Sequence, residues 1–172
     1  AEATGTQAGL VTGGAAAALT LGTAAILAGE DLGRIERLPH SDGFPNEILI
    51  AREQRCGYDH AILAAGAKFV EVGFNEIVSN AGVRRTELWE YEAAIGPNTA
   101  GIAYRHAADS QPNLTALVEL AHSRGLPVIV DDHVSRVSAA AEDKLRDVIE
   151  AYVDAKAHPK LLHLMHATVD SL

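Results

Sequence analysis

The chain has 172 residues, of which 48% are hydrophobic and 22% charged, and this composition is ordinary for a globular domain with a buried core. Its formal net charge of −9 disfavours broad binding to nucleic acids, because an acidic protein repels their phosphates. The single cysteine, Cys56, excludes an internal disulfide bond and favours a reducing, cytoplasmic setting.

The first predicted elements are a strand over residues 7–12 and a helix that follows Gly13 and Gly14 and runs to Ala28. This helix is rich in alanine and shorter than the roughly 20 strongly apolar residues of a membrane span, so we expect a buried helix and no membrane association. Residues 30–46 contain several proline and glycine breakers and predict an irregular loop.

Short apolar runs then alternate with helical patterns. We expect strands over residues 47–51, 68–72, 99–104 and 127–130, and helices over residues 58–65, 86–95 and 112–124. Gly66 and Gly125 are expected to end two of these helices, and Thr86 to cap the start of a third. The alternation predicts an α/β fold in three layers, α/β/α, with helices on both faces of a mainly parallel sheet.

The last forty residues have a different pattern, with no predicted strand. Residues 138–157 place Leu145, Ile149 and Tyr152 on one face of a long amphipathic helix, and a short helix follows Pro159. We therefore expect residues 1–132 to form the α/β domain and residues 133–172 to form a helical tail packed on it.

The turn from Thr12 to Ala15 is the first candidate for chemistry. Glycines allow consecutive backbone N–H groups to point at one anion, and the start of a helix adds a favourable dipole. The small residues Gly13 and Gly14 leave room for a phosphate. A plain turn before a helix would have the same sequence, so this alternative stays open.

Asp131 is the second candidate, because it follows an apolar run at the expected carboxyl end of a strand, where ligands bind in open α/β sheets. A carboxylate there can pair with a protonated heterocyclic nitrogen, or it can cap the next segment. Together with Asp132 and His133 it could also bind a divalent metal ion, although adjacent residues rarely chelate one ion well.

The segment over residues 52–60 carries the remaining candidates. Arg52 and Arg55 follow a predicted strand and could meet an anion or form surface ion pairs. Asp59 is expected to cap the helix after it. His163 and His166 lie one helical turn apart, and an exposed or packed role is expected for them rather than metal binding.

Several segments together resemble the selenocysteine-synthase-like enzymes of fold type I, which use pyridoxal 5'-phosphate. The resemblance covers roughly residues 1–132. It lies in AGLVTGGAAAALTLGTAAILAG (8–29), RIERLP (34–39), PNEILIAREQRCGYDHAILAAGAKFVEVG (45–73), AAIGPNTAGIAY (93–104) and LVELAHSRGLPVIVD (117–131). It implies the large domain of a lyase or transferase that acts on an amino acid or amino sugar, and a homo-oligomer.

The resemblance also implies roles for individual residues. The phosphate-holding loop of the family falls on Thr12, Gly13, Gly14 and Ala15, with Gly13 in place of the usual serine. The aspartate that pairs with the pyridine nitrogen falls on Asp131. We expect His133, two residues later, to bind the cofactor as well. The histidine that stacks on the ring falls on Gln54, an amide that cannot stack as an imidazole does. If the implied site exists, Gly14 and Asp131 should face one crevice.

The family's cofactor-binding lysine lies in an S-G-G-K stretch that this chain lacks, and the family's enzymes are more than twice as long. Lys156 and Lys160 lie near the expected distance after Asp131, and Lys160 is the better-spaced candidate for the catalytic lysine. There are two alternatives to an active pyridoxal-phosphate enzyme. One is a non-catalytic α/β domain without the lysine, and the other is a metal-dependent hydrolase that uses Asp131, Asp132 and His133.

Overall fold

The computed structural model describes residues 10–74, 85–107 and 109–132. The boundary between two compact units falls inside the first helix, between Ala18 and Leu19. The predicted tail over residues 133–172, with the candidates His133 and Lys160, lies outside the described residues.

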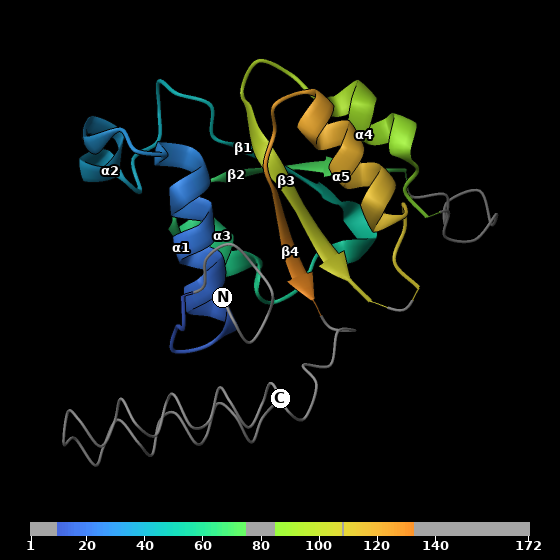
Figure 1. The fold of residues 1–172 in the computed structure, drawn as a ribbon, viewed down its shortest axis with the longest axis horizontal. Helices are drawn as coiled ribbons and strands as arrows, with labels where there is room; N and C mark the ends of the chain where they lie inside the picture. The colour runs from blue at the N-terminus through green and yellow to red at the C-terminus, as the bar shows by residue number, and fades with distance from the viewer. Residues whose placement is uncertain (1–9, 75–84, 108, 133–172) are drawn as a thin grey trace, which may run out of the picture. The chain divides into compact units, whose positions relative to one another are not determined.

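Four parallel strands form the sheet of the described chain, in the order β2-β1-β3-β4 (Figure 1). The strands are β1 (Glu47–Ala51), β2 (Lys68–Val72), β3 (Thr99–His106) and β4 (Val128–Asp132). All three pairings are parallel, and the register sets Ile50 beside Glu71 and Arg105 beside Asp131. The predicted parallel sheet is thereby confirmed.

Helices cover both faces of this sheet (Figure 1). They are α1 (Ala15–Ala28) and α3 (Asp59–Ala64) on one face, and α4 (Leu88–Ala94) and α5 (Leu114–Ser123) on the other. Successive strand residues point to opposite faces, so Ile48 and Ile50 pack with Leu27 of α1 while Leu49 packs with Leu117 of α5. The two apolar cores confirm the predicted three-layer α/β/α architecture.

Two predictions in the first third of the chain were wrong. Residues 10–12, the described part of the first predicted strand, form no strand. The predicted loop over residues 30–46 contains a helix, α2 (Leu32–Arg37). Asp31 starts it, because its carboxylate accepts hydrogen bonds from the N–H groups of Gly33 and Arg34.

The predicted helix boundaries needed smaller corrections. α4 begins two residues after Thr86, and the carboxylate of Glu90 accepts a hydrogen bond from the N–H of its N-cap residue, Glu87. Gly66 follows α3 as expected, with a φ of +101° that favours glycine. None of the described helices combines the length and apolar character needed to cross a bilayer.

Candidate functional site

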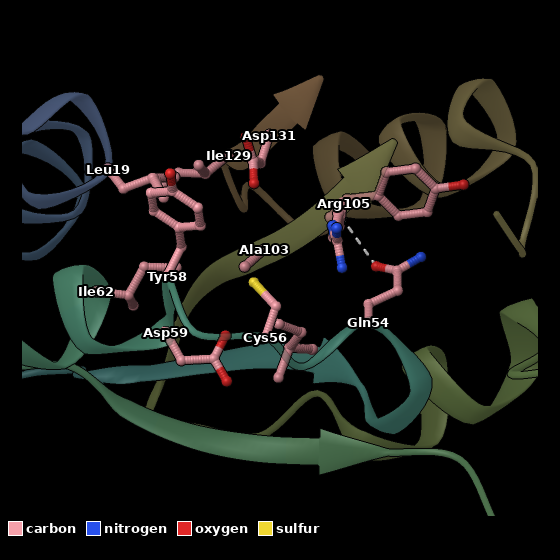
Figure 2. Close-up of a pocket in the computed structure, with 12 residues that line it drawn as sticks. Leu19, Gln54, Cys56, Tyr58, Asp59, Ile62, Ala103, Arg105, Ile129 and Asp131 are labelled. Carbon is pink, nitrogen blue, oxygen red and sulfur yellow. Dashed lines mark hydrogen bonds between the residues drawn. The ribbon is translucent and has the colours of Figure 1, made fainter. Parts of the chain in front are cut away.

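A small pocket lies at the carboxyl ends of β3 and β4, on the face covered by α1 and α3 (Figure 2). Its volume is about 20 Å³, which is room for about one water molecule. Polar lining comes from Gln54, Cys56, Tyr58, Asp59, Arg105 and Asp131, and apolar lining includes Leu19, Ile62, Ala103 and Ile129. Ligands of open parallel sheets bind at this edge, so the pocket is the candidate site.

Asp131 lines this pocket as a half-buried residue of β4. The strand is less buried than its apolar sequence suggests, because it is an edge strand in the described sheet and Val130 is 39% exposed. Gln54 lines the same pocket, so the structure brings two of the predicted site residues together.

Asp132 belongs to the opposite face of β4, since adjacent strand residues alternate. It pairs with His106 of β3, whose Nδ1 lies 3.2 Å from its carboxylate. The carboxylates of Asp131 and Asp132 therefore point apart, and this geometry does not support a metal site built on both.

Gln54 is the last residue of the short 3-10 helix η1 (Arg52–Gln54), and its side chain is only 5% exposed. Its Oε1 accepts a hydrogen bond of 3.0 Å from the N–H of Arg105, and its Nε2 donates one of 3.2 Å to the carbonyl of Gln111. The two ends of the amide thus connect η1 to β3 and to the segment after β3. The predicted contact of Gln54 with a cofactor ring remains a prediction.

Arg105 was missed by the sequence reasoning. It is half-buried, and its Nε atom is fully buried with no hydrogen-bond partner in the described structure. The sequence signal was available: within TAGIAYRH, strand alternation puts Arg105 on the same face as Ala103, where an unpaired cation is unusual.

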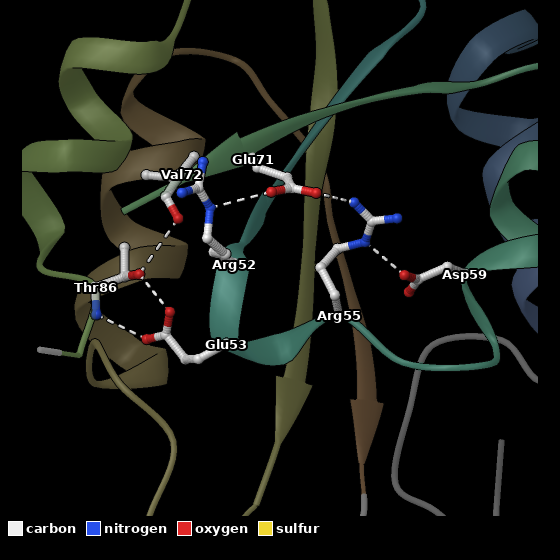
Figure 3. A network of polar contacts seen from close by, with 7 residues as sticks. All are labelled: Arg52, Glu53, Arg55, Asp59, Glu71, Val72 and Thr86. Atoms are coloured by element: carbon white, nitrogen blue, oxygen red, sulfur yellow. Dashed lines mark hydrogen bonds and ion pairs between the residues drawn. The ribbon is translucent and has the colours of Figure 1, made fainter. Parts of the chain in front are cut away.

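Arg52 and Arg55 form ion pairs, which was one of the two predicted alternatives (Figure 3). Both contact the carboxylate of Glu71 on β2, and the Arg55 guanidinium also lies 4.6 Å from the centre of the Phe69 ring. Asp59 is not the N-cap as predicted. It is the first residue of α3 and pairs with Arg55, and this hydrogen bond raises the pKa of Arg55.

A second contact fixes the same segment to the start of α4 (Figure 3). The carboxylate of Glu53 accepts two hydrogen bonds of 2.7 Å, one from the N–H and one from the hydroxyl of buried Thr86. Because Thr86 donates both hydrogen bonds to Glu53, its side chain does not cap α4. The contacts of Glu53 and Arg55 hold the segment that carries Gln54 and Tyr58 into the pocket.

The turn from Thr12 to Ala15 precedes α1 as expected, and the hydroxyl of Thr12 donates a hydrogen bond of 2.9 Å to the carbonyl of Gly14. Gly14 has a φ of +142°, and a Cβ added at Gly13 or Gly14 would meet no atom within 4 Å. The φ of Gly14 favours glycine, and the phosphate-binding role of the turn remains a prediction.

The sheet and pocket define a three-layer α/β domain with its candidate site at the carboxyl edge of parallel strands. No family model matches the sequence. The chain is 32% identical over 169 residues to the 5'-C-glycyluridine monooxygenase-decarboxylase of a Streptomyces species, a match over 94% of this chain and 40% of that enzyme. It is 28% identical over 159 residues to the D-glucosaminate-6-phosphate ammonia lyase of Salmonella typhimurium (strain 14028s / SGSC 2262), over 88% of this chain and 39% of that enzyme.

The solved structure of a D-glucosaminate-6-phosphate ammonia-lyase is also similar, with a TM-score of 0.60 and 27% identity over 69% of this chain and 32% of that one. The chain thus spans less than half the length of the relatives that it matches. These similarities support the resemblance at the level of fold-type-I pyridoxal-phosphate enzymes. Neither named relative is a selenium transferase, so the narrower selenocysteine-synthase-like assignment remains a proposal.

Proposed function

We propose that this chain is the cofactor-binding part of a pyridoxal-phosphate-dependent lyase or transferase of the selenocysteine-synthase-like group, acting on an amino acid or amino sugar. The observation that carries the proposal is the carboxylate of Asp131 in a pocket at the carboxyl edge of the parallel sheet. Residues 1–132 would form the cofactor-binding domain and residues 133–172 a helical tail on it, in a cytoplasmic homo-oligomer.

The names of the two curated relatives support the reaction class. A glycyl group and a glucosaminate share one chemical unit, a carbon that carries both an amino group and a carboxylate. Decarboxylation and ammonia elimination both break a bond at or beside such a carbon. Pyridoxal phosphate supplies an electron sink for the negative charge that such reactions develop.

The described residues fit the cofactor in their chemistry. Asp131 would hold the proton on the pyridine nitrogen. N–H groups at a glycine-rich turn such as Thr12–Ala15 suit a phosphate, and this role of the turn is proposed from the resemblance alone. The pocket's present volume is too small for a pyridine ring. Binding of the ring therefore requires a wider pocket than the described residues form.

Lys160 is the proposed attachment point, and this part of the proposal rests on sequence spacing alone. A domain that keeps the fold and binds the cofactor without a covalent bond is the second candidate function. The absence of the S-G-G-K sequence favours it.

The test is to mix the protein with pyridoxal phosphate, record its visible spectrum, reduce it with borohydride and locate any labelled lysine by mass spectrometry. We expect a new visible band and a label on Lys160 that is absent from Lys160→Ala. We also expect about tenfold weaker binding in Asp131→Asn, because the charged partner of the ring nitrogen is lost.

The outcomes separate the two candidates. Cofactor binding that depends on Asp131 without any labelled lysine would support the non-catalytic domain. The absence of binding would remove both, and size-exclusion chromatography with light scattering on the same samples tests the homo-oligomer.

A further inference from the structure

The two outer strands of the described sheet, β2 and β4, differ in the charge that they carry (Figure 1). On β2, Lys68 and Glu71 are both engaged in ion pairs. On β4, the first three residues are the apolar Val128, Ile129 and Val130, and the last of them is 39% exposed. Charged residues on an edge strand hinder pairing with another chain, whereas an apolar edge favours it. Of these two edges, β4 is therefore the candidate for an interaction surface.

The backbone of β4 has one side directed away from the sheet. Among the described strands β4 pairs only with β3, and the N–H of Ile102 donates a hydrogen bond to the carbonyl of Pro127 at its start. Because strand residues alternate, the N–H and carbonyl groups of Val128, Val130 and Asp132 point away from β3. An added strand can form a second ladder of hydrogen bonds with these groups.

The charges along β4 indicate which strand can be added. Arg124, at the end of α5, precedes the strand, and Asp131 and Asp132 close it. An antiparallel copy of the same strand brings the acidic end of one chain near the basic end of the other, whereas a parallel copy sets the acids side by side. Arg124 pairs with Glu92, but both side chains are half exposed, and such pairs exchange partners at little cost.

We propose that two copies of this chain associate through their β4 strands, which run antiparallel about a twofold axis at Ile129. Val130 of one copy then lies opposite Val128 of the other, and two four-stranded sheets become one continuous sheet. This interface gives the homo-oligomer of the proposed function a specific surface, but it rests on β4 and not on cofactor binding.

The test measures self-association of the protein without the cofactor. Sedimentation velocity gives the mass at about 10 and about 300 µM protein, and hydrogen exchange at the same concentrations identifies the protected amides. We expect a dimer at the higher concentration, where exchange at the outward amides of Val128 and Val130 slows at least about fivefold. Exchange over residues 68–72, on the opposite edge of the sheet, should not change.

Two variants change the proposed interface, and a third is the matched control. Val130→Lys puts a charge on the apolar edge and should remain a monomer at about 300 µM. Arg124→Glu sets acid against acid and should raise the dissociation constant about tenfold. Leu32→Lys changes a residue of α2 that is 76% exposed, and it should dimerise like the wild type. Circular dichroism checks that each variant is folded, and the exchange data on the wild type need no variant.

Four results would overturn the proposal. They are a wild type that stays monomeric, a dimer that persists in folded Val130→Lys, a dimer that Leu32→Lys abolishes, and protection at β2 in place of β4. A monomeric wild type would also remove the homo-oligomer from the proposed function. It would leave cofactor binding untouched, because that is read separately from the spectrum with pyridoxal phosphate.

Discussion

The arginines after β1 and near the end of β3 differ in whether their side chains have acidic partners. After β1, Arg52 and Arg55 share the carboxylate of Glu71, and Arg55 also holds Asp59 (Figure 3). Near the end of β3, the Nε atom of Arg105 is buried without a hydrogen-bond partner in the described structure, although the side chain lines a pocket with Asp131. The arginines after β1 therefore stabilise the fold through ion pairs, whereas the buried Nε of Arg105 is expected to destabilise it.

The largest expected effect comes from replacing an arginine by methionine, once after β1 and once in β3. Arg55→Met should lower the free energy of unfolding by about 2–3 kcal/mol, because it leaves the carboxylate of Asp59, only 11% exposed, without its cation. Arg105→Met should cause no loss. Urea unfolding followed by circular dichroism measures both, and equal losses at the two arginines would contradict the comparison.

Replacing Gln54 tests the hydrogen bonds between the segment after β1 and the end of β3. Gln54→Met removes the hydrogen bonds to the N–H of Arg105 and the carbonyl of Gln111, so the free energy of unfolding should fall by about 2 kcal/mol. Gln54→Glu keeps the acceptor for Arg105 but sets a buried carboxylate oxygen against the carbonyl of Gln111, so it should lose at least as much. Hydrogen exchange at the Arg105 amide should accelerate in the methionine variant, and an unchanged rate would show that this bond is unimportant.

The buried hydroxyl of Tyr104 allows the stability of the β3 end to be measured separately. Its hydroxyl donates a hydrogen bond of 2.7 Å to the carbonyl of Pro112, so Tyr104→Phe should cost about 1 kcal/mol. Burial raises the pKa of Tyr104 above its ordinary 10.0, which means that the folded state holds the phenol proton more tightly than the unfolded state. This contribution is intact below pH 10.0 and is lost as the pH rises through the raised pKa.

Urea midpoints of the wild type and Tyr104→Phe across the alkaline range measure this contribution. The variant should lose less stability than the wild type above the ordinary tyrosine pKa. Parallel curves would indicate that the pKa of Tyr104 is the same in the folded and unfolded states.

The smallest effect is expected at the exposed pair of Lys68 and Asp42, whose charged atoms lie 2.9 Å apart. The lysine holds the pKa of Asp42 below its ordinary 3.8, so the pair acts above that pH and is lost as the pH falls through the lowered pKa. Lys68→Met should return the pKa of Asp42 toward 3.8, as measured by carboxyl carbon chemical shifts. An unchanged pKa would show that this ion pair does not persist in solution.

The sheet could be predicted from sequence because its strands are short apolar runs between clear helical patterns. The helix α2 was missed because the proline and glycine breakers Pro39, Gly43 and Pro45 all lie after it, whereas its start depends on the carboxylate of Asp31, which accepts two hydrogen bonds. Thr86 was assigned to a cap by its residue type, but its hydrogen bonds to Glu53 join positions 33 residues apart, which no local pattern contains.

The candidate site could be predicted only in part. Asp131 was found by its place after an apolar run, and the glycine turn by its composition. The double hydrogen bond of Gln54 and the lack of a partner at Arg105 depend on which segments meet in three dimensions. The sequence suggests which residues can bind a ligand, but only the fold shows which of them already make hydrogen bonds or ion pairs within the protein.

Gly66 sits where the end of α3 meets the segment after α2. Its φ of +101° is one that other L-amino acids rarely adopt, and an added Cβ would collide with the backbone of Pro39. Both constraints act at once, and neither can be relieved by rotating a side chain. In a saturation-mutagenesis library selected for folded protein, this position should therefore retain glycine.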